Sequence, residues 1–366
     1  MINKLKNPTF IYIVKRIISS IITLILILAV VTALLRLIPE EKLYDISQYN
    51  KIKASAGLTA AENFKNKQLF LYGRKDSFGN DISVFSSILK YIYWILPIPK
   101  EIPVRWNTDY TEVIKTIRVY SYFGKSITRN EYVLDMLLNR IGISFMISII
   151  SLILSYLISY PLGIAMAKKP GGIVDKIGNI FVVINYAIPA LVFYMVINSF
   201  MGNANGIFGN LFSYIYMEDN PLSLIPPIFS LVFLSIPGIS IWVRRYTLDE
   251  MSNDYVKFAR SKGLSQNKIM YTHVLRNAMV PLIRSIPIAF IGAIIGSYYV
   301  EKIWNIPGTG ALLISSLQGS SPDVACVQGL TVIYAALSML AFLVGDIITA
   351  LVDPRIRLKG WLDEWG

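Results

Sequence analysis

Side chains that carry out chemistry are rare in this sequence of 366 residues, and the few present stand alone. Cys326 is its one cysteine and His273 its one histidine, which excludes a disulfide within the chain and a metal site built from several such ligands. The nucleotide-binding pattern G-x-x-x-x-G-K-[ST] is absent, and so is the zinc-binding pattern H-E-x-x-H. We therefore expect no catalytic residue, no metal site and no cofactor on this chain.

Asp346 is the one acidic residue that lies deep in an apolar run. An acid inside a membrane segment is a functional candidate by default, because its burial in lipid is costly. Asp346 lies about two helical turns before Asp353. This position favours a polar contact between helices near the cytoplasmic face over a role in chemistry. Without a partner acid in an earlier span, the Gly345-Asp346 pair does not make an aspartyl protease.

Residues 244–281 are the longest soluble-looking run in the second half of the chain, and two short helices are predicted within it. Asp254 is suited to be the N-cap of a helix over 255–262, and Gly263 is suited to end that helix. Ser265 is suited to cap a second helix that reaches about Asn277. The stretch joins the apolar run that ends at 243 to the one that begins at 278.

One face of the first short helix is predicted to be a docking surface. Val256, Ala259 and Gly263 are spaced i, i+3 and i+7, so they share a narrow face of that helix. Small residues at the last two positions let another surface approach the backbone closely. Arg260 and Lys262 flank this face with positive charge. The alternative is a basic loop next to the membrane that touches only lipid headgroups.

The same stretch resembles the cytoplasmic EAA loop of ABC importer membrane subunits, in the dipeptide and oligopeptide branch. Lys257 stands where the general motif has glutamate, and His273 and Leu275-Arg276 also depart from it, as is usual in this branch. In that family the loop docks as a coupling helix in a groove of the ATPase subunit. The resemblance implies that the ATPase-coupling residues are Asp254, Tyr255, Val256, Ala259, Arg260, Lys262, Gly263 and Leu264.

Composition assigns the whole chain to the membrane. Hydrophobic residues make up 54% of it and charged residues 16%, which excludes an ordinary soluble domain and indicates a polytopic membrane protein. A net charge of +12 in a soluble protein would suggest nucleic acid. Here the excess of Lys and Arg in the cytoplasmic loops of membrane proteins explains the charge, so no nucleic-acid partner is expected.

Six membrane spans and four regions are predicted. The regions are an N-terminal segment with the first span (1–39), an extracytoplasmic region (40–140), a core of five spans (141–352) and a cytoplasmic tail (353–366). A cleaved signal peptide is the alternative for the first run, which is long for that purpose. The spans are residues 17–35, 141–167, 177–200, 221–243, 278–300 and 324–352, with the loop 244–277 in the cytoplasm and a kink in the third span at Pro189.

A regular polar stripe marks the second span. Its five serines recur nearly every four residues, so they share one helix face. Such a stripe either packs helices closely or lines a polar path, and packing is the interpretation we favour. The serines are Ser144, Ser148, Ser151, Ser155 and Ser159.

Residues 40–140 are expected outside the cell membrane as a small domain or an extended loop. Residues 83–99 are apolar and aromatic but contain Lys90 and Pro97. A span there would invert the topology of everything that follows. A packed or interfacial helix is therefore the favoured interpretation of this run.

A second motif follows the fifth span. Gly308 and Gly310 are expected to adopt turn geometry that other residues cannot. This segment resembles the external segment of the same permeases, which faces the binding protein and the mouth of the pathway. A re-entrant loop that only plugs the structure is the alternative. The residues that carry the resemblance, and the expected external gate or binding-protein contact, are Glu301, Trp304, Pro307, Gly308 and Gly310.

The two motifs together resemble the B-type permease subunit of dipeptide and oligopeptide ABC importers. The resemblance implies an all-α type I importer fold in the bacterial plasma membrane and no enzymatic activity. It implies as partners a second permease of the C type, two ATPases that hold ATP and Mg²⁺, and an extracellular solute-binding protein, lipid-anchored or periplasmic. Peptides are the implied substrate, and nickel chelates, haem, glutathione or sugars are alternatives. A secondary transporter is a weaker alternative, because convincing internal repeats and mid-membrane charges are lacking.

Cysteine labelling tests the predicted topology. Of the 35 Lys and Arg residues, 18 fall in the proposed cytoplasmic segments, and the two short external loops hold one, Lys302. In a Cys326→Ser background, Ser55→Cys should therefore react with a membrane-impermeant maleimide added outside intact cells. Labelling of this cysteine only from the cytoplasmic side would contradict the six-span topology.

Overall fold

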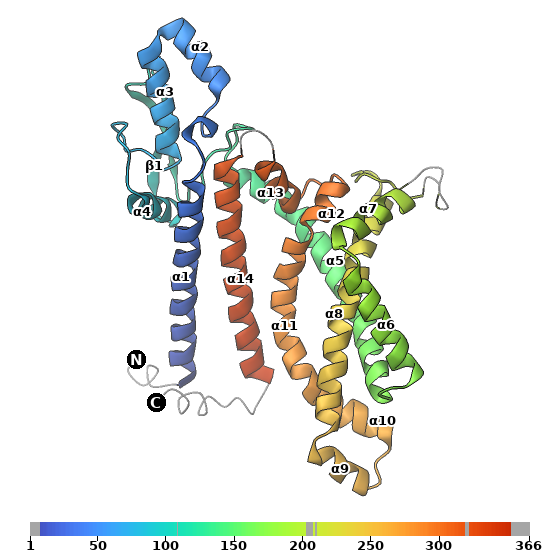
Figure 1. Cartoon of the computed structure of the whole chain (residues 1–366). Helices are drawn as coiled ribbons and strands as arrows, with labels where there is room; N and C mark the ends of the chain where they lie inside the picture. Colours follow the sequence, from blue (N-terminus) through green and yellow to red (C-terminus); the bar gives the residue numbers. More distant parts are fainter. Residues whose placement is uncertain (1–7, 108, 203–207, 209–210, 319–321, 353–366) are drawn as a thin grey trace. The chain divides into compact units, whose positions relative to one another are not determined.

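Helices dominate the structure, a computed structural model that describes residues 8–107, 109–202, 208, 211–318 and 322–352 (Figure 1). The predicted tail, residues 353–366, lies outside the described residues. The chain divides into two compact units. Unit 1 comprises Met1–Arg16, Ile143–Ala311 and Ser338–Gly366, and unit 2 comprises Ile17–Gly142 and Leu312–Leu337.

Five described helical segments are long and apolar enough to cross a membrane, or six if one bent pair counts as a span. The prediction of about six spans agrees with this number. The long helices are α1 (Pro8–Leu35), α5 (Val133–Lys168), α8 (Ile225–Met251), α11 (Leu275–Gly296) and α14 (Val324–Val352).

The bent pair is α6 (Ile173–Ala187) and α7 (Ala190–Met201), which meet at 95°. The break falls at Ile188 and Pro189, where the kink of the third span was predicted. Pro189 is the N-cap of α7, and Ile188 before it is extended because a following proline disfavours the helical conformation. The expected kink is thus a sharp break between two helices.

The serine stripe of α5 is buried along its whole length. The Ser159 hydroxyl donates to the Ile236 carbonyl of α8 at 3.3 Å, and the Ser240 hydroxyl donates to the Ser159 carbonyl at 3.3 Å. A Cβ on Gly163 would lie 2.6 Å from the Ser240 carbonyl, so glycine is required for this close approach. The stripe therefore packs α5 against α8 at Ser159, as favoured.

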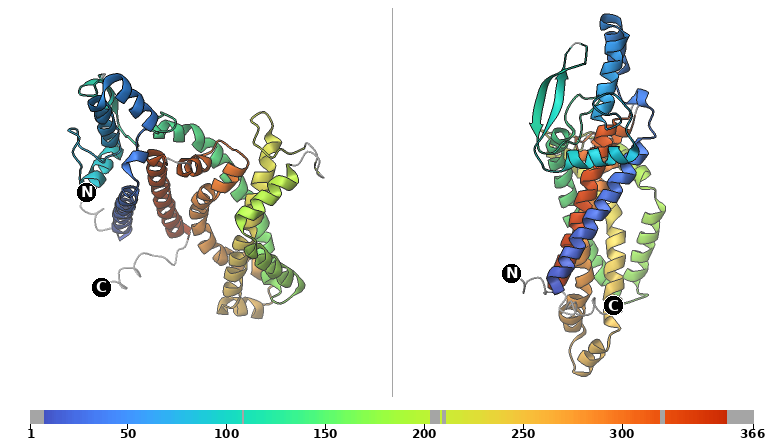
Figure 2. Two further views of the ribbon diagram at one scale, coloured as in Figure 1. Left: turned by 45° about the horizontal axis from the view of Figure 1, so that its top comes forward. Right: turned by 90° about the vertical axis from the view of Figure 1, so that its left-hand side faces the viewer.

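Residues 40–140 form a folded region within unit 2 rather than an extended loop. α4 is 12 residues long, too short to span a membrane, which confirms the packed helix expected in 83–99. A two-stranded antiparallel hairpin was not anticipated and is an exception to the all-α expectation. The elements are η1 (Glu40–Lys42), α2 (Ile46–Ala56), α3 (Leu58–Leu71), α4 (Val84–Ile95), β1 (Lys100–Trp106) and β2 (Val113–Val119) (Figure 2).

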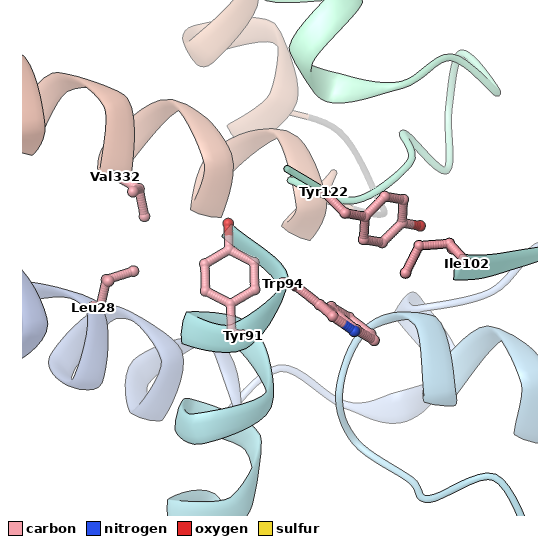
Figure 3. Close-up of a cluster of buried hydrophobic side chains, with 6 residues drawn as sticks. All are labelled: Leu28, Tyr91, Trp94, Ile102, Tyr122 and Val332. Carbon is pink, nitrogen blue, oxygen red and sulfur yellow. The ribbon is translucent and has the colours of Figure 1, made fainter. Parts of the chain in front are cut away.

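The core of unit 2 joins α1, α4, β1 and α14. Tyr91 and Trp94 project from α4 between Leu28 of α1 and Ile102 of β1 (Figure 3). The Trp94 and Tyr122 rings meet edge to face with centroids 5.4 Å apart, a favourable aromatic geometry. The six buried residues of this cluster are Leu28, Tyr91, Trp94, Ile102, Tyr122 and Val332.

Arginine side chains join the end of α1 to the folded region of residues 40–140. Arg74 donates to the carbonyls of Leu35 and Arg36, at 2.6 and 2.9 Å. Carbonyls in the last turn of a helix have no partner within the helix, so Arg74 supplies one. Arg36 in turn donates to the Ile82 carbonyl at 2.6 Å and to the Ser87 hydroxyl at 2.6 Å.

Lys90 is an unusual half-buried cation in the same region. Its ammonium donates to the carbonyls of Phe70 and Lys75 at 3.0 and 3.1 Å and lies 3.6 Å from the centroid of the Phe70 ring. Burial disfavours the charged form and lowers the pKa of Lys90 to about 8.

This lowered pKa predicts a pH-dependent stability. Between pH 8 and the ordinary lysine pKa, the unfolded chain keeps a proton that the folded chain has lost, so stability rises with pH in this window. Lys90→Met should remove that rise. Thermal unfolding of the detergent-solubilised protein, followed by tryptophan fluorescence, measures it. Lys53→Met, at an exposed lysine of α2, is the control, and an equal loss of the rise in both variants would contradict the assignment.

Candidate functional site

The loop expected at residue 244 begins later, because α8 continues as a helix to Met251. Arg244 lies inside α8, where Asp175 of α6 holds it by two bonds: Nε to Oδ1 at 2.6 Å and Nη2 to Oδ2 at 2.9 Å. The loop predicted to begin at Arg244 therefore begins after Met251, although the apolar run itself ends at Val243 as predicted. Paired charges of this kind let a helix continue past its apolar segment.

Asp175 was missed by the sequence analysis. It is 3% exposed and also accepts from the Gly171 amide at 2.8 Å, so it fixes the turn before α6 as well as Arg244. Its position one helical turn after the glycine pair of a basic turn was the available signal. The signal is weak, because the partner arginine lies 69 residues further along the chain.

The first short helix of the loop is α9 (Asp254–Ser261). Asp254 was predicted to be its N-cap, but Asn253 occupies that position, so the helix begins one residue earlier than expected. The Asp254 carboxylate instead forms an ion pair with Lys257 at 2.8 Å, one turn along the same helix. The Asn253 amide is turned back toward Glu250 of α8, to which it donates at 3.0 Å.

Gly263 ends α9, as predicted. Its φ of +74° is in the left-handed region that favours glycine. The Gly263 amide donates to the Arg260 carbonyl at 2.9 Å, and the Leu264 amide donates to the Ala259 carbonyl at 3.3 Å. These two bonds are a Schellman motif, which satisfies carbonyls at the helix end.

The second short helix is not a separate element. Ser265 is its N-cap, as predicted, and accepts from the Lys268 amide at 3.4 Å. The helix α10 (Gln266–Lys268) then passes into a π-helical turn, η3 (Ile269–Val274), and directly into α11. One helical segment therefore runs from the loop into the membrane segment, and no break falls at Asn277 (Figure 1).

The face of α9 expected to dock a partner is covered by the chain itself. Val256 is 1% exposed and Ala259 7% exposed. They pack against η3, where the buried residues are Ile269, Met270 and Val274. Tyr255 and Leu264 border this cluster, and the Tyr255 hydroxyl donates to Glu250 at 2.6 Å. Ala259 thus allows close approach of η3, and the expectation that Val256 and Ala259 face a partner was wrong, whereas Gly263 is exposed.

The open face of α9 carries Phe258. This side chain is 61% exposed, and the Lys262 ammonium lies 4.5 Å from its ring centroid. Aromatic side chains are enriched in protein interfaces, so Phe258 is a candidate anchor for a partner. The exposed residues of this face are Asp254, Lys257, Phe258, Arg260, Ser261 and Lys262.

The second motif folds around the buried carboxylate of Glu301 in α12 (Tyr298–Ile303). Its Oε2 accepts from the amides of Gly310 and Ala311 at 2.7 and 3.0 Å. These amides lie in the first turn of α13 (Thr309–Leu317), where amide groups have no partner within the helix. The Thr309 amide donates to the hydroxyl of Ser144 at 2.9 Å. Glu301 and Ser144 therefore cap α13 from outside it.

The two glycines of this motif act through size rather than through turn geometry. The residue with a left-handed backbone is Asn305, at φ +53°, and neither Gly308 nor Gly310 has positive φ. A Cβ on Gly308 would overlap the Glu301 carboxylate, and one on Gly310 would lie 2.5 Å from the Tyr298 ring. The expectation that these glycines supply special turn geometry was wrong, because they make room for Glu301 and Tyr298.

Most of the motif is buried within unit 1. Trp304 is fully buried in a cluster with Ile147 and Leu231, and its carbonyl accepts from the Tyr216 amide at 2.7 Å. Pro307 is exposed, whereas Glu301, Trp304, Gly308 and Gly310 are buried. Those four residues build the turn and offer no open surface to a binding protein. Whether the turn gates a pathway stays a prediction.

Asp346 makes a polar contact between helices, as favoured from the sequence. Its carboxylate lies 2.7 Å from Nε of Arg16 in α1 and 3.0 Å from Nη2 of Arg284 in α11. Two arginines thus compensate one buried carboxylate. A buried acid with such partners is a structural contact in unit 1.

The long apolar helices of the described residues place the chain in the class of polytopic helical membrane proteins. The family model for the binding-protein-dependent transport system inner membrane component matches residues 159–358. The chain belongs to this family, and it is a multi-pass protein of the bacterial plasma membrane. The fold class predicted from the sequence is confirmed, with the hairpin β1–β2 as an addition outside the matched residues.

Similar proteins include two curated relatives and one solved structure. The oligopeptide transport system permease protein AmiC of Streptococcus pneumoniae serotype 4 (strain ATCC BAA-334 / TIGR4) is 35% identical over 210 residues, which are 57% of this chain and 41% of that protein. The oligopeptide transport system permease protein AppB of Bacillus subtilis (strain 168) is 32% identical over 259 residues, 69% of this chain and 81% of that protein. The inward-facing methionine ABC transporter MetNI is 16% identical with a TM-score of 0.47, covering 60% of this chain and 97% of that chain.

The capping role of Glu301 predicts faster hydrogen exchange when its side chain is removed. Glu301→Ala leaves the amides of Gly310 and Ala311 without their acceptor, and each bond to a charged group contributes about 1.5–3 kcal/mol. Hydrogen exchange of the peptide that covers 306–317 should therefore quicken by about tenfold or more, since 1.4 kcal/mol is about tenfold. Lys302→Ala, at the exposed neighbouring residue, is the control. Unchanged exchange in Glu301→Ala would show that other groups satisfy these amides.

Proposed function

We propose that this chain is the B-type permease subunit of an ATP-driven ABC importer of oligopeptides or dipeptides, which forms half of the translocation pathway. The peptide class is supported by two of its relatives, AmiC and AppB, which are named as oligopeptide transport system permeases. The chain spans less than half the length of the pneumococcal protein. Its own residues carry no nucleotide-binding pattern, so the proposal assigns ATP and Mg²⁺ to two partner ATPase subunits.

The observation that carries the proposal is the mechanical connection of α9. The Val256 and Ala259 side chains fix α9 to η3, which continues into α11. On its other side, Glu250 of α8 accepts from Tyr255 and Asn253. A force applied to α9 is therefore delivered to two membrane helices at once. This is the property that a coupling element between an ATPase and a membrane pathway needs.

The partner surface in this proposal is the open face of α9 around Phe258. Phe258 is the anchor, and the charges of Asp254, Lys257 and Lys262 surround it. Val256, Ala259, Gly263, Tyr255 and Leu264 hold α9 in place rather than contact the ATPase. A second permease of the C type and a solute-binding protein, lipid-anchored or periplasmic, complete the proposed complex.

Phe258→Ala tests the coupling surface. Removal of an exposed aromatic anchor should weaken ATPase capture by the purified permease about tenfold or more, because hot-spot truncations cost about 2 kcal/mol or more. Peptide uptake by cells should fall with it. Since Phe258 is 61% exposed, its removal should leave the thermal stability of the isolated chain unchanged.

Phe78→Ala is the matched control, because Phe78 is an exposed phenylalanine of the external region, 88% exposed. It should bind ATPase and support uptake like the wild-type chain. Ala259→Glu is a poor test, because it would place a charge in the cluster that fixes α9. Wild-type ATPase capture and uptake by both Phe258→Ala and Phe258→Glu would overturn the proposed coupling surface.

A further inference from the structure

Unit 2 contains a cavity of about 620 Å³ in the external region, outside the residues that match the family. It lies between α3, β1 and the segment 122–132, and β1 and α3 are seen in the two views of Figure 2. Its volume is within the range of about 300–1,000 Å³ that is typical of small-molecule sites. Seven aromatic side chains line it: Tyr44, Phe64, Tyr72, Trp106, Tyr110, Tyr122 and Tyr132.

Two cations on this cavity have no carboxylate partner. Arg105 is exposed on β1, and Lys125 is half-buried with its ammonium 5.8 Å from the centroid of the Tyr132 ring. Neither side chain takes part in any of the ion pairs found among the described residues. The Arg105 backbone lies opposite Lys115 in the hairpin, at an irregular point of the register, and the Tyr72 hydroxyl donates to the Lys125 carbonyl at 3.0 Å. Both cations thus lie on segments that are paired with other parts of the region.

One carboxylate, that of Asp45, also lines the cavity. Asp45 is the N-cap of α2, and both bonds it accepts, from the amides of Ser47 and Gln48, fall on Oδ1. Its Oδ2 atom is not used by the cap. The cavity therefore presents separated charges of both signs among aromatic rings.

We propose that this cavity binds a short peptide with an aromatic side chain and free termini. The peptide carboxylate pairs with Arg105 and Lys125, its ammonium pairs with Asp45, and its aromatic side chain packs on the rings that line the cavity. A ligand of one charge would leave either Asp45 or the two cations without a partner. As to substrate class, the inference depends on the proposed function, and it adds a first binding site for the peptide outside the membrane core.

The test uses the full-length chain alone in phosphatidylcholine nanodiscs, without ATPase or binding protein. The probe is the tripeptide Phe-Ala-Phe, and isothermal titration calorimetry measures its dissociation constant. Arg105→Gln with Lys125→Gln should weaken binding about tenfold or more, because bonds between charged groups are lost. Amidation of the probe's C-terminus should weaken binding to the wild-type chain to a similar extent, and should have no further effect on the double variant.

Lys115→Gln with Arg118→Gln is the matched control, because these exposed cations lie on β2 of the same hairpin and not on the cavity. It should bind like the wild-type chain. Absence of saturable binding, equal binding of the amidated probe to the wild-type chain, or an equal loss in the control would each overturn the proposal. The amidated probe needs no variant, so misfolding cannot explain its result.

Reconstituted uptake separates this inference from the proposed function. ATP-dependent peptide uptake by the complex, with no peptide binding to the chain alone, would overturn only the cavity. Peptide binding at the cavity by a chain that captures no ATPase would overturn the proposed function and leave the cavity. Arg105→Lys with Lys125→Arg keeps both positive charges and should retain binding. If the two side chains only supported the fold, exchanging their shapes should weaken binding despite the unchanged charge.

Discussion

Backbone amides and carbonyls that are buried away from water must find partners within the protein, and this constraint explains two features of the helices of unit 1. Where α11 and α12 give way to α13, Glu301 and Ser144 accept from the first amides of α13. Pro237 lies inside α8 and has no amide hydrogen. The carbonyl of Phe233, four residues earlier, therefore lacks its usual hydrogen-bond donor within the helix. The side-chain amide of Asn185 in α6 donates to that carbonyl at 3.2 Å.

The same constraint explains the glycines of the motif that contains Glu301. A capping carboxylate must reach the amides of Gly310 and Ala311 directly, and any side chain at Gly308 would occupy its place. Glu301 and Gly308 are thus two parts of one arrangement. The spacing of the motif thus brings a buried acceptor and a position without a side chain to the same place.

Much of the fold could be predicted from the sequence, because apolar runs and helix-stop residues act locally. The break at Pro189, the stop at Gly263 and the cap at Ser265 all lie where their chemistry placed them. The hairpin was missed because β1 contains Pro103, and its charged residues Lys100, Glu101 and Arg105 do not alternate with apolar ones as in a typical strand. Asp175 was missed because an ion pair between distant helices leaves no local pattern.

The candidate site was predicted in place but not in orientation. The spacing of Val256 and Ala259 shows that they share a face of α9, but spacing alone cannot show what covers that face. In a short amphipathic helix, a covering element of the same chain and a partner protein require the same apolar residues. In this chain the covering element is η3. Its residues Ile269, Met270 and Val274 pack against Val256 and Ala259 and leave no room there for a partner. Phe258, on the opposite face, is then the apolar side chain left to a partner.

The buried acids of unit 1 separate the two kinds of transporter considered from the sequence. A secondary transporter uses acids that exchange a proton or ion during transport. Asp175 is held by Arg244, and Asp346 lies between Arg16 and Arg284. Glu301 is used by backbone amides of α13. Since each of these carboxylates is already bound to another group of the chain, their arrangement favours a pathway driven from outside the chain over one driven by ions within it.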